Sequence, residues 1–267
     1  MLNEEIPCRL VNNFCLIPAK VDGEAGYLIL DTGAPGLVLN RPATGQQREG
    51  LSCTQEVSVG ATQVKELQWA DHHEHDVTAY TLEMDHLSRA TDLPILGLLG
   101  YERLQDYEIL LDYQQERLLL YPARENQLHE RIKPQRRIAF SMQSHLPIVT
   151  LTYGDRTYRF ILDTGAGSNL ISPALYQQLH QTASLTDKEE LRGLDGEIQV
   201  VTKAHLSGLH IDDFAVPTME YLVQDLDHLQ SMTDLQIDGL LGAPFLQLGT
   251  FSINFVEQKL FLWRIFP

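Results

Sequence analysis

The amino-acid sequence predicts an all-β fold with few short helices, organised as two pseudo-symmetric lobes. Two observations support this prediction: both halves of the chain repeat the same motifs in the same order, and strand-like runs rich in β-branched and aromatic residues alternate with Gly, Asp and Asn turns. A length of 267 residues with 43% hydrophobic residues suffices for one large or two moderate cores. We therefore expect a mainly β chain whose two halves fold alike.

The repeat begins with a four-residue motif. Asp-Thr-Gly-Ala occurs at residues 31–34 and again at 163–166, an offset of 132 residues (163 minus 31). Each copy follows an apolar run that is typical of a strand, at residues 27–30 and 159–162. The pattern predicts that each strand delivers its Asp into a tight turn, here called an elbow.

A second motif is repeated farther along each half. Gly-Leu-Leu-Gly occupies residues 97–100 and 239–242, an offset of 142 (239 minus 97), so the second half holds ten more residues between its motifs (142 minus 132). A pair of strand-like segments follows each motif, at residues 108–113 with 117–121 and at 251–255 with 259–263. Since both motifs recur in order, we interpret the chain as an internal duplication.

Other elements are read from local signals. Residues 148–153 alternate in a way that is typical of a strand, and the turn Gly154-Asp155 leads into the next strand. The best helical segment is 172–180, with Ser172 as the cap and Pro173 at the first helical position. We expect a second short helix after Gly242.

At these motifs the chain resembles the retropepsin-like aspartic proteases, in a single-chain form with both lobes fused. A lone Asp-Thr-Gly would be weak evidence. Here two elbows are each followed by Gly-Leu-Leu-Gly, 66 and 76 residues after the Asp (97 minus 31, 239 minus 163). The resemblance covers nearly the whole chain and implies two pepsin-like lobes with the active site at their interface. We expect the lobes at residues 1–127 and 138–267, with 128–137 as the interlobe connection.

The resemblance assigns the catalytic role to Asp31 and Asp163. Two carboxylates brought face to face can share one proton, so that one acts as a base and the other as an acid toward a single water molecule. The threonines of the elbows are implied to hydrogen-bond across the lobe interface. The glycines are expected to provide backbone freedom and to leave room for water or substrate. The supporting residues are therefore Thr32, Gly33, Thr164 and Gly165.

The function expected on these grounds is an aspartic endopeptidase that uses no metal or cofactor. The alternative is a catalytically silent peptide-binding module with the same fold, although such a module has no need to keep two mutually repelling carboxylates. Ala34 and Ala166 match the retroviral pattern, whereas pepsin-like enzymes usually have Ser or Thr there. The hydrogen bond that such a hydroxyl would give each carboxylate is missing, so we expect activity at less acidic pH than in pepsin-like enzymes.

Charge and composition limit the partners. The formal net charge of −16 argues against nucleic acid, and the basic stretch 122–137 is interpreted as a solvated connection. No apolar segment has membrane length, so we expect no membrane insertion. Because the fused halves supply both aspartates, we expect a monomer that acts on a peptide or protein substrate. The first residues lack the features of a secretory signal, which indicates a cytoplasmic protein if Met1 is the native start and an extracytoplasmic one if a signal was removed.

Two residue groups are given non-catalytic interpretations. Cys8, Cys15 and Cys53 are odd in number and absent from the second half, so free thiols are expected, with a bridge between the first two left open. Residues 71–76, Asp-His-His-Glu-His-Asp, have enough donors for a metal but lack the separated ligand pairs of structural zinc sites. We interpret this cluster as a polar surface loop.

The segment covering the cleft, the flap, is the least determined part. Residues 193–200 have turn residues between apolar flanks and fit either a hairpin tip over the cleft or an ordinary exposed hairpin. The corresponding residues 50–60 of the first half look less like a hairpin.

Overall fold

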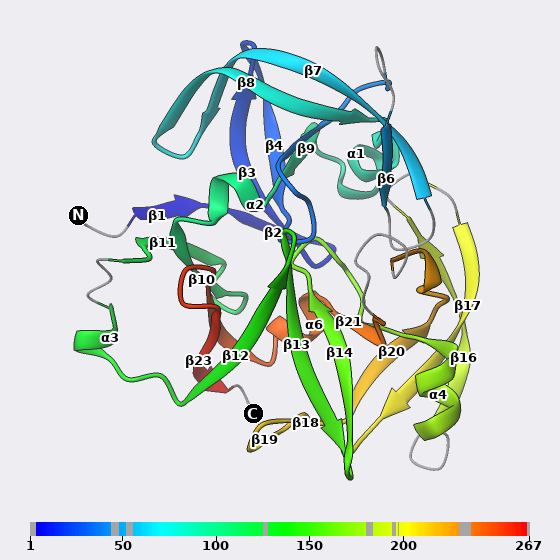
Figure 1. The fold of residues 1–267 in the computed structure, drawn as a ribbon. Helices are drawn as coiled ribbons and strands as arrows, with labels where there is room; N and C mark the ends of the chain where they lie inside the picture. Colours follow the sequence, from blue (N-terminus) through cyan, green and yellow to red (C-terminus); the bar gives the residue numbers. More distant parts are fainter. Residues whose placement is uncertain are drawn as a thin grey trace.

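The computed structural model describes most of the chain. Its structure is mainly β, with five short helices in the described part of the chain (Figure 1). Among the helices so described, none is long and apolar enough to cross a membrane. The residues described are 4–43, 48–51, 56–124, 128–179, 184–193, 196, 198–229 and 236–265.

An eight-stranded sheet forms the N-terminal lobe, in the order β2-β3-β4-β9-β5-β8-β7-β6. Its strands are β2 (Arg9–Val11), β3 (Phe14–Val21), β4 (Glu24–Leu30), β5 (Leu37–Asn40), β6 (Arg48–Leu51), β7 (Glu56–Trp69), β8 (His72–Leu82) and β9 (Ile95–Leu99). Figure 1 shows this sheet in blue to cyan above the rest of the chain. β4 and β9 run parallel at its centre, and Thr32, just after the carboxyl end of β4, bonds to Thr164 of the second half.

A fifteen-stranded sheet contains the remaining strands, with the main order β1-β11-β10-β22-β23-β12-β13-β14-β21-β15-β20-β17-β16, with β18 paired to β13 and β19 paired to β18. The strands are β1 (Glu4–Pro7), β10 (Tyr107–Asp112), β11 (Arg117–Pro122), β12 (Arg136–Gln143), β13 (Leu146–Tyr153), β14 (Arg156–Leu162), β15 (Leu170–Ile171), β16 (Ser184–Arg192), β17 (Ile198–Leu206), β18 (His210–Ile211), β19 (Phe214–Ala215), β20 (Met219–Val223), β21 (Gly239–Leu241), β22 (Gly249–Asn254) and β23 (Lys259–Ile265). The part from β13 to β16 belongs entirely to the C-terminal half.

The first six strands of this sheet come from both halves of the chain. β10 pairs antiparallel with β22, and Leu110 lies opposite Ser252. These two residues are equivalent in the repeat (252 minus 110 is 142), so the pseudo-two-fold axis passes through this pair. A core cluster of buried side chains also runs from one lobe into the other. The lobes are therefore joined by shared sheet and shared core as well as by the connecting segment.

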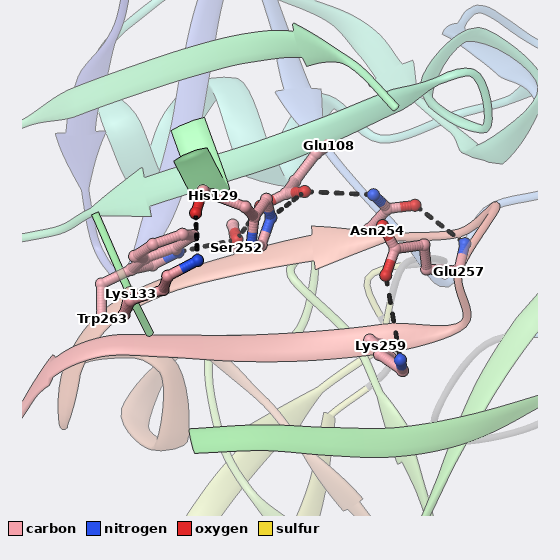
Figure 2. Close-up of polar contacts among 8 residues, drawn as sticks. All are labelled: Glu108, His129, Lys133, Ser252, Asn254, Glu257, Lys259 and Trp263. Carbon is pink, nitrogen blue, oxygen red and sulfur yellow. Dashed lines mark hydrogen bonds and ion pairs between the residues drawn. The ribbon is translucent and has the colours of Figure 1, made fainter. Parts of the chain in front are cut away.

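A buried carboxylate lies within the shared strands (Figure 2). Glu108 of β10 is fully buried and accepts hydrogen bonds from Ser252 Oγ at 2.5 Å and from Asn254 Nδ2 at 3.0 Å. The Nε2 atom of His129 lies 3.0 and 2.9 Å from its two oxygens. Trp263 Nε1 in turn donates to Ser252 Oγ at 2.8 Å. We call Glu108, His129, Ser252, Asn254 and Trp263 the Glu108 cluster.

The helices are short and lie at the ends of strands. They are α1 (Asp85–Thr91), α2 (Tyr101–Leu104), α3 (Leu128–Arg131), α4 (Pro173–Leu179) and α6 (Ala243–Leu246). α4 begins where the sequence predicts, and Ser172 Oγ accepts the N–H of Leu175 at 3.1 Å as a helix cap. The helix expected after Gly242 is α6, and α2 is its counterpart after Gly100.

One local prediction was wrong, and one strand pair was only weakly indicated by the sequence. Residues 72–76 are not a surface loop but the first part of β8, which pairs with β7 in a long hairpin. Near residues 50–60, whose sequence looks less like a hairpin than that of residues 193–200, β6 and β7 nevertheless pair antiparallel. Pairing with a neighbouring strand overrides weak local signals in both places. The tip of this hairpin, 52–55, lies outside the described residues.

The structure describes only part of the predicted hairpin at 193–200, and it describes the predicted interlobe connection at 128–137. β16 and β17 form an antiparallel hairpin on either side of its tip, but residues 194, 195 and 197 lie outside the described residues. The connection at 128–137 contains α3 and the start of β12, and His129 packs edge-on against Phe261 with ring centroids 4.3 Å apart. Part of the connection is therefore packed against the shared strands.

Candidate active site

The two elbows are held by the central strands of each lobe. Asp31 follows β4, and its N–H donates to the carbonyl oxygen of Leu99 at 3.0 Å. Asp163 follows β14 in the same way, with its N–H donating to Leu241 at 2.9 Å. Both leucines belong to the Gly-Leu-Leu-Gly motifs and are fully buried. The second motif of each half thus supports the elbow by backbone bonding and core packing.

The threonines of the elbows bond across the interface in both directions. Thr32 N–H donates to Thr164 Oγ1 at 3.0 Å, and Thr164 N–H donates to Thr32 Oγ1 at 3.0 Å. Each hydroxyl donates in turn to a carbonyl oxygen of the opposite strand, that of Leu162 at 3.1 Å and that of Leu30 at 2.9 Å. Both threonines are fully buried. Because every polar atom of this exchange is satisfied, it fixes one elbow against the other.

The carboxyl groups of Asp31 and Asp163 meet at this interface, each lying against the glycine of the opposite elbow. Asp31 is 4% exposed, and Asp163 is partly exposed. Burial raises the pKa of Asp31 well above its usual range, and the charge of Asp163 raises it further. Burial also raises the pKa of Asp163, against the lowering effect of the backbone N–H of Gly165. The pair therefore retains a proton at a pH where an isolated Asp is ionised, and this proton belongs to the pair.

The glycines of the elbows are needed for close approach. A Cβ atom on Gly33 would lie 2.7 Å from Asp163 Oδ2, and one on Gly165 would collide with the carboxyl carbon of Asp31. Neither glycine has a positive φ, so the expectation of special backbone freedom was wrong. The absence of a side chain lets each carboxyl lie over the opposite elbow.

The backbone donors around the two carboxyls differ. Asp31 Oδ1 accepts the N–H of Gly33 at 2.8 Å and the N–H of Ala34 at 3.0 Å. Asp163 Oδ1 accepts the N–H of Gly165 at 2.8 Å but no bond from the N–H of Ala166 among the described residues, and the N–H of Gly33 in the opposite elbow also lowers its pKa. Hydrogen bonds to the ionised form lower a carboxyl pKa, so these donors partly offset burial. The near-identical motifs therefore produce two different electrostatic environments.

Sequence reasoning missed the turn residues that face the elbows. His145, in the turn between β12 and β13, places Nε2 3.0 Å from the carbonyl oxygen of Gly33 in the other lobe. Asn13, its equivalent (145 minus 13 is 132), donates from Nδ2 to the carbonyl oxygen of Gly167 at 3.0 Å. Extending the repeat alignment upstream of the elbows would have paired these two residues, but it would not have shown that they cross the interface.

The other clusters considered in the sequence have packing partners. Glu74 accepts a hydrogen bond from Trp69 Nε1 at 2.9 Å and lies 3.3 Å from Nε of Arg103. His72 stacks on Trp69, with ring centroids 4.2 Å apart, and its Nε2 lies 3.2 Å from Glu4. Within the part of the chain that the structure describes, no three metal-binding side chains come together.

Cys8 and Cys15 are free thiols. Cys8 is partly exposed and Cys15 is buried, and neither forms a disulfide, so the bridge left open by the sequence is absent. Cys53 lies outside the described residues.

Comparisons with known proteins agree with this geometry. Residues 149–245, which include the second elbow and its Gly-Leu-Leu-Gly motif, match the aspartyl protease family. The fold is similar to the crystal structure of the aspartic proteinase from Irpex lacteus, with a TM-score of 0.56 and 12% identity over 99% of this chain and 98% of that chain. No curated protein matches the sequence. Residues 149–245 are therefore similar to the aspartyl protease family, and the chain as a whole has a two-lobed, pepsin-like, all-β fold.

Proposed function

We propose that the chain is an aspartic endopeptidase that hydrolyses peptide bonds with a water molecule activated between Asp31 and Asp163. The observation that carries the proposal is the pair itself: two carboxyls, delivered by equivalent turns of the two lobes, each lie against the glycine of the opposite elbow, and the pKa of both is raised. Such a pair presents a base and an acid to one water molecule at the same time.

The proposed reaction has no covalent intermediate. The ionised carboxylate removes a proton from the water, whose oxygen attacks the scissile carbonyl carbon, while the protonated partner hydrogen-bonds the carbonyl oxygen. The tetrahedral intermediate then releases the amine, which takes up a proton from the pair. Because the carboxyls titrate as a unit, neither Asp31 nor Asp163 is assigned a fixed role. This route uses no metal or cofactor.

Each lobe supplies half of the proposed site. We propose lobes at residues 1–127 and 138–267, joined by 128–137, that act within one chain on a peptide or protein substrate. The hydrogen bonds of Thr32 and Thr164 across the interface hold the carboxyls in place, so little rearrangement is needed when the water is activated. A monomer is sufficient because both aspartates come from the same chain.

The pH range of activity follows from the raised pKa of the pair. Activity requires one proton on the pair and falls when that proton is lost. Since burial raises the pKa of both carboxyls, the proton is kept to higher pH than in an exposed Asp. We expect a bell-shaped dependence of kcat/KM with its maximum on the acidic side of neutral.

The test is cleavage of a diverse peptide library between about pH 3 and 8. The unmodified chain is compared with Asp31→Asn and Asp163→Asn, and Asp155→Asn serves as the control because Asp155 is an exposed turn residue. We expect each elbow variant to lose about a thousandfold or more in kcat/KM, while the control keeps its activity. Binding of peptides without cleavage by the unmodified chain would contradict the proposal and indicate a peptide-binding module.

A further inference from the structure

The turn between β12 and β13 reaches from the C-terminal lobe to the first elbow. His145 in this turn is partly buried, and its Nε2 lies 3.0 Å from the carbonyl oxygen of Gly33. The carbonyl oxygen is an acceptor, so Nε2 carries the hydrogen. Burial lowers the pKa of His145, and the charge of Glu102 opposes this effect. The imidazole donates this bond in its neutral Nε2–H form and in its charged form alike.

The acceptor belongs to the peptide that also holds Asp31. The carbonyl of Gly33 and the N–H of Ala34 form one planar peptide unit, and this N–H donates to Asp31 Oδ1 at 3.0 Å. A bond to the oxygen of a planar peptide fixes the direction of its N–H. It also polarises the unit, which strengthens the donation on the other side. His145 therefore acts on the carboxyl of Asp31 through a single peptide group.

The second elbow is the internal comparison. Asn13, the equivalent of His145, donates to the carbonyl oxygen of Gly167, two residues beyond the corresponding position, Gly165. Within the described residues, Asp163 Oδ1 accepts the N–H of Gly165, and no bond from the N–H of Ala166 reaches it. Within the part of the chain that the structure describes, a bond from the alanine N–H of an elbow to its own Asp carboxyl thus occurs only at the elbow whose peptide is held by the opposite lobe.

We propose that His145 is a positioning residue that locks the peptide between Gly33 and Ala34 and thereby makes the two carboxyls of the pair inequivalent. The proposal rests on the proposed function. It follows that the C-terminal lobe contributes Asp163 and also orients the elbow of the N-terminal lobe. Fixed orientation of a reacting group contributes to kcat more than to substrate affinity.

The experiment compares two substitutions of His145 with a matched control. His145→Leu removes the donor, and His145→Gln keeps an N–H donor on the side chain. His210→Leu is the control, because His210 is exposed and its Nδ1 lies 3.1 Å from the carbonyl oxygen of Gly208, away from the elbows. Thermal unfolding is measured for all variants, and kcat and KM are referred to the folded fraction.

We expect His145→Leu to lower kcat about tenfold or more with KM changed less than about twofold. His145→Gln should retain kcat within about threefold, and His210→Leu should resemble the unmodified chain. Unchanged kcat in His145→Leu would overturn the proposal, and so would equal losses in the Leu and Gln variants.

A second readout does not require turnover. The carboxyl signals of ¹³C-labelled Asp31 and Asp163 are followed by NMR as a function of pH in each variant. We expect the apparent pKa at which Asp31 ionises to rise in His145→Leu, because the N–H of Ala34 then holds the ionised form less firmly, and to stay near its original value in His145→Gln. An unchanged titration in His145→Leu would refute the role of His145, whereas absence of cleavage by the unmodified chain would refute the proposed function alone.

Discussion

The junction of the two lobes holds two buried acidic sites of opposite character. At the Glu108 cluster, one carboxylate is surrounded by donors from Ser252, Asn254 and His129 (Figure 2). At the elbows, Asp31 faces a second carboxyl, that of Asp163, and burial and repulsion raise its pKa. A buried charge is tolerated where it is paired and hydrogen-bonded and is costly where it is not. Glu108 thus joins strands from the two halves, whereas Asp31 and Asp163 repel each other when both are ionised.

Because the two sites differ in this way, substitutions in them are expected to have different effects on stability. Removing a carboxylate from the Glu108 cluster leaves several buried donors without their acceptor, so stability should fall. Removing a carboxylate from the elbows relieves repulsion, so stability should rise slightly near neutral pH while activity is lost. Three measurements of unfolding, in order of decreasing effect, test this contrast.

The largest change in stability is expected at Glu108. Glu108→Gln replaces an acceptor oxygen with an amide that donates, and this amide faces donors of Ser252 and Asn254. We expect the free energy of unfolding to fall by about 3 kcal/mol, as measured by denaturant unfolding. Glu83→Gln is the control, because Glu83 is exposed. Equal stability of the two variants would show that the Glu108 cluster does not hold the shared strands together.

The elbow carboxyls should show a smaller effect of opposite sign. Because the folded pKa of Asp31 is raised, its stabilising contribution is fully present below the unfolded pKa and is lost as pH rises through the folded value. Asp31→Asn removes this loss, so we expect the variant to be more stable than the unmodified chain by about 1 kcal/mol near neutral pH.

The measurement is urea unfolding at a series of pH values, with Asp155→Asn as the control. The advantage of Asp31→Asn should disappear below the usual pKa of an Asp. An advantage that is the same at every pH would contradict the repulsion between the carboxyls.

The smallest change in stability is expected at the other end of the β10–β22 pair, which the pseudo-two-fold axis relates to the position of Glu108. Thr250, the equivalent of Glu108 (250 minus 108 is 142), donates from Oγ1 to Asp112 Oδ2 at 3.0 Å. Asp112 is partly exposed and water can replace this donor, so Thr250→Val should cost only about 0.5–1 kcal/mol. A loss as large as that of Glu108→Gln would show that the two ends of the pair contribute equally.

Parts of the fold and site were predictable because they depend on local or repeated sequence. The strand ends at Leu30 and Leu162, the helix after Ser172 and the helix after Gly242 all lie where local signals place them. The strand at 72–76 was missed and the pairing of β6 with β7 was only weakly indicated, because a strand partner can stabilise residues whose own preference is weak.

The reason why the elbows need glycine could not be predicted from the nearby sequence either. The tight turns at Gly33 and Gly165 suggest that these residues need conformational freedom. The structure shows instead that the carboxyl group of the opposite Asp lies where a side chain on each glycine would be. Such a contact joins residues 130 positions apart (163 minus 33), which no local rule describes.

The sequence by itself determined the duplication, the all-β class and the candidate aspartates, because repeated motifs and strand periodicity are properties of the chain. Tertiary structure alone decided the inequivalence of the elbows: His145 reaches the peptide of Gly33, whereas Asn13 bonds to Gly167. It also decided the position of Glu108 among donors from the other half. Both features arise from contacts between segments distant in sequence, and these contacts exist only once the lobes are packed together.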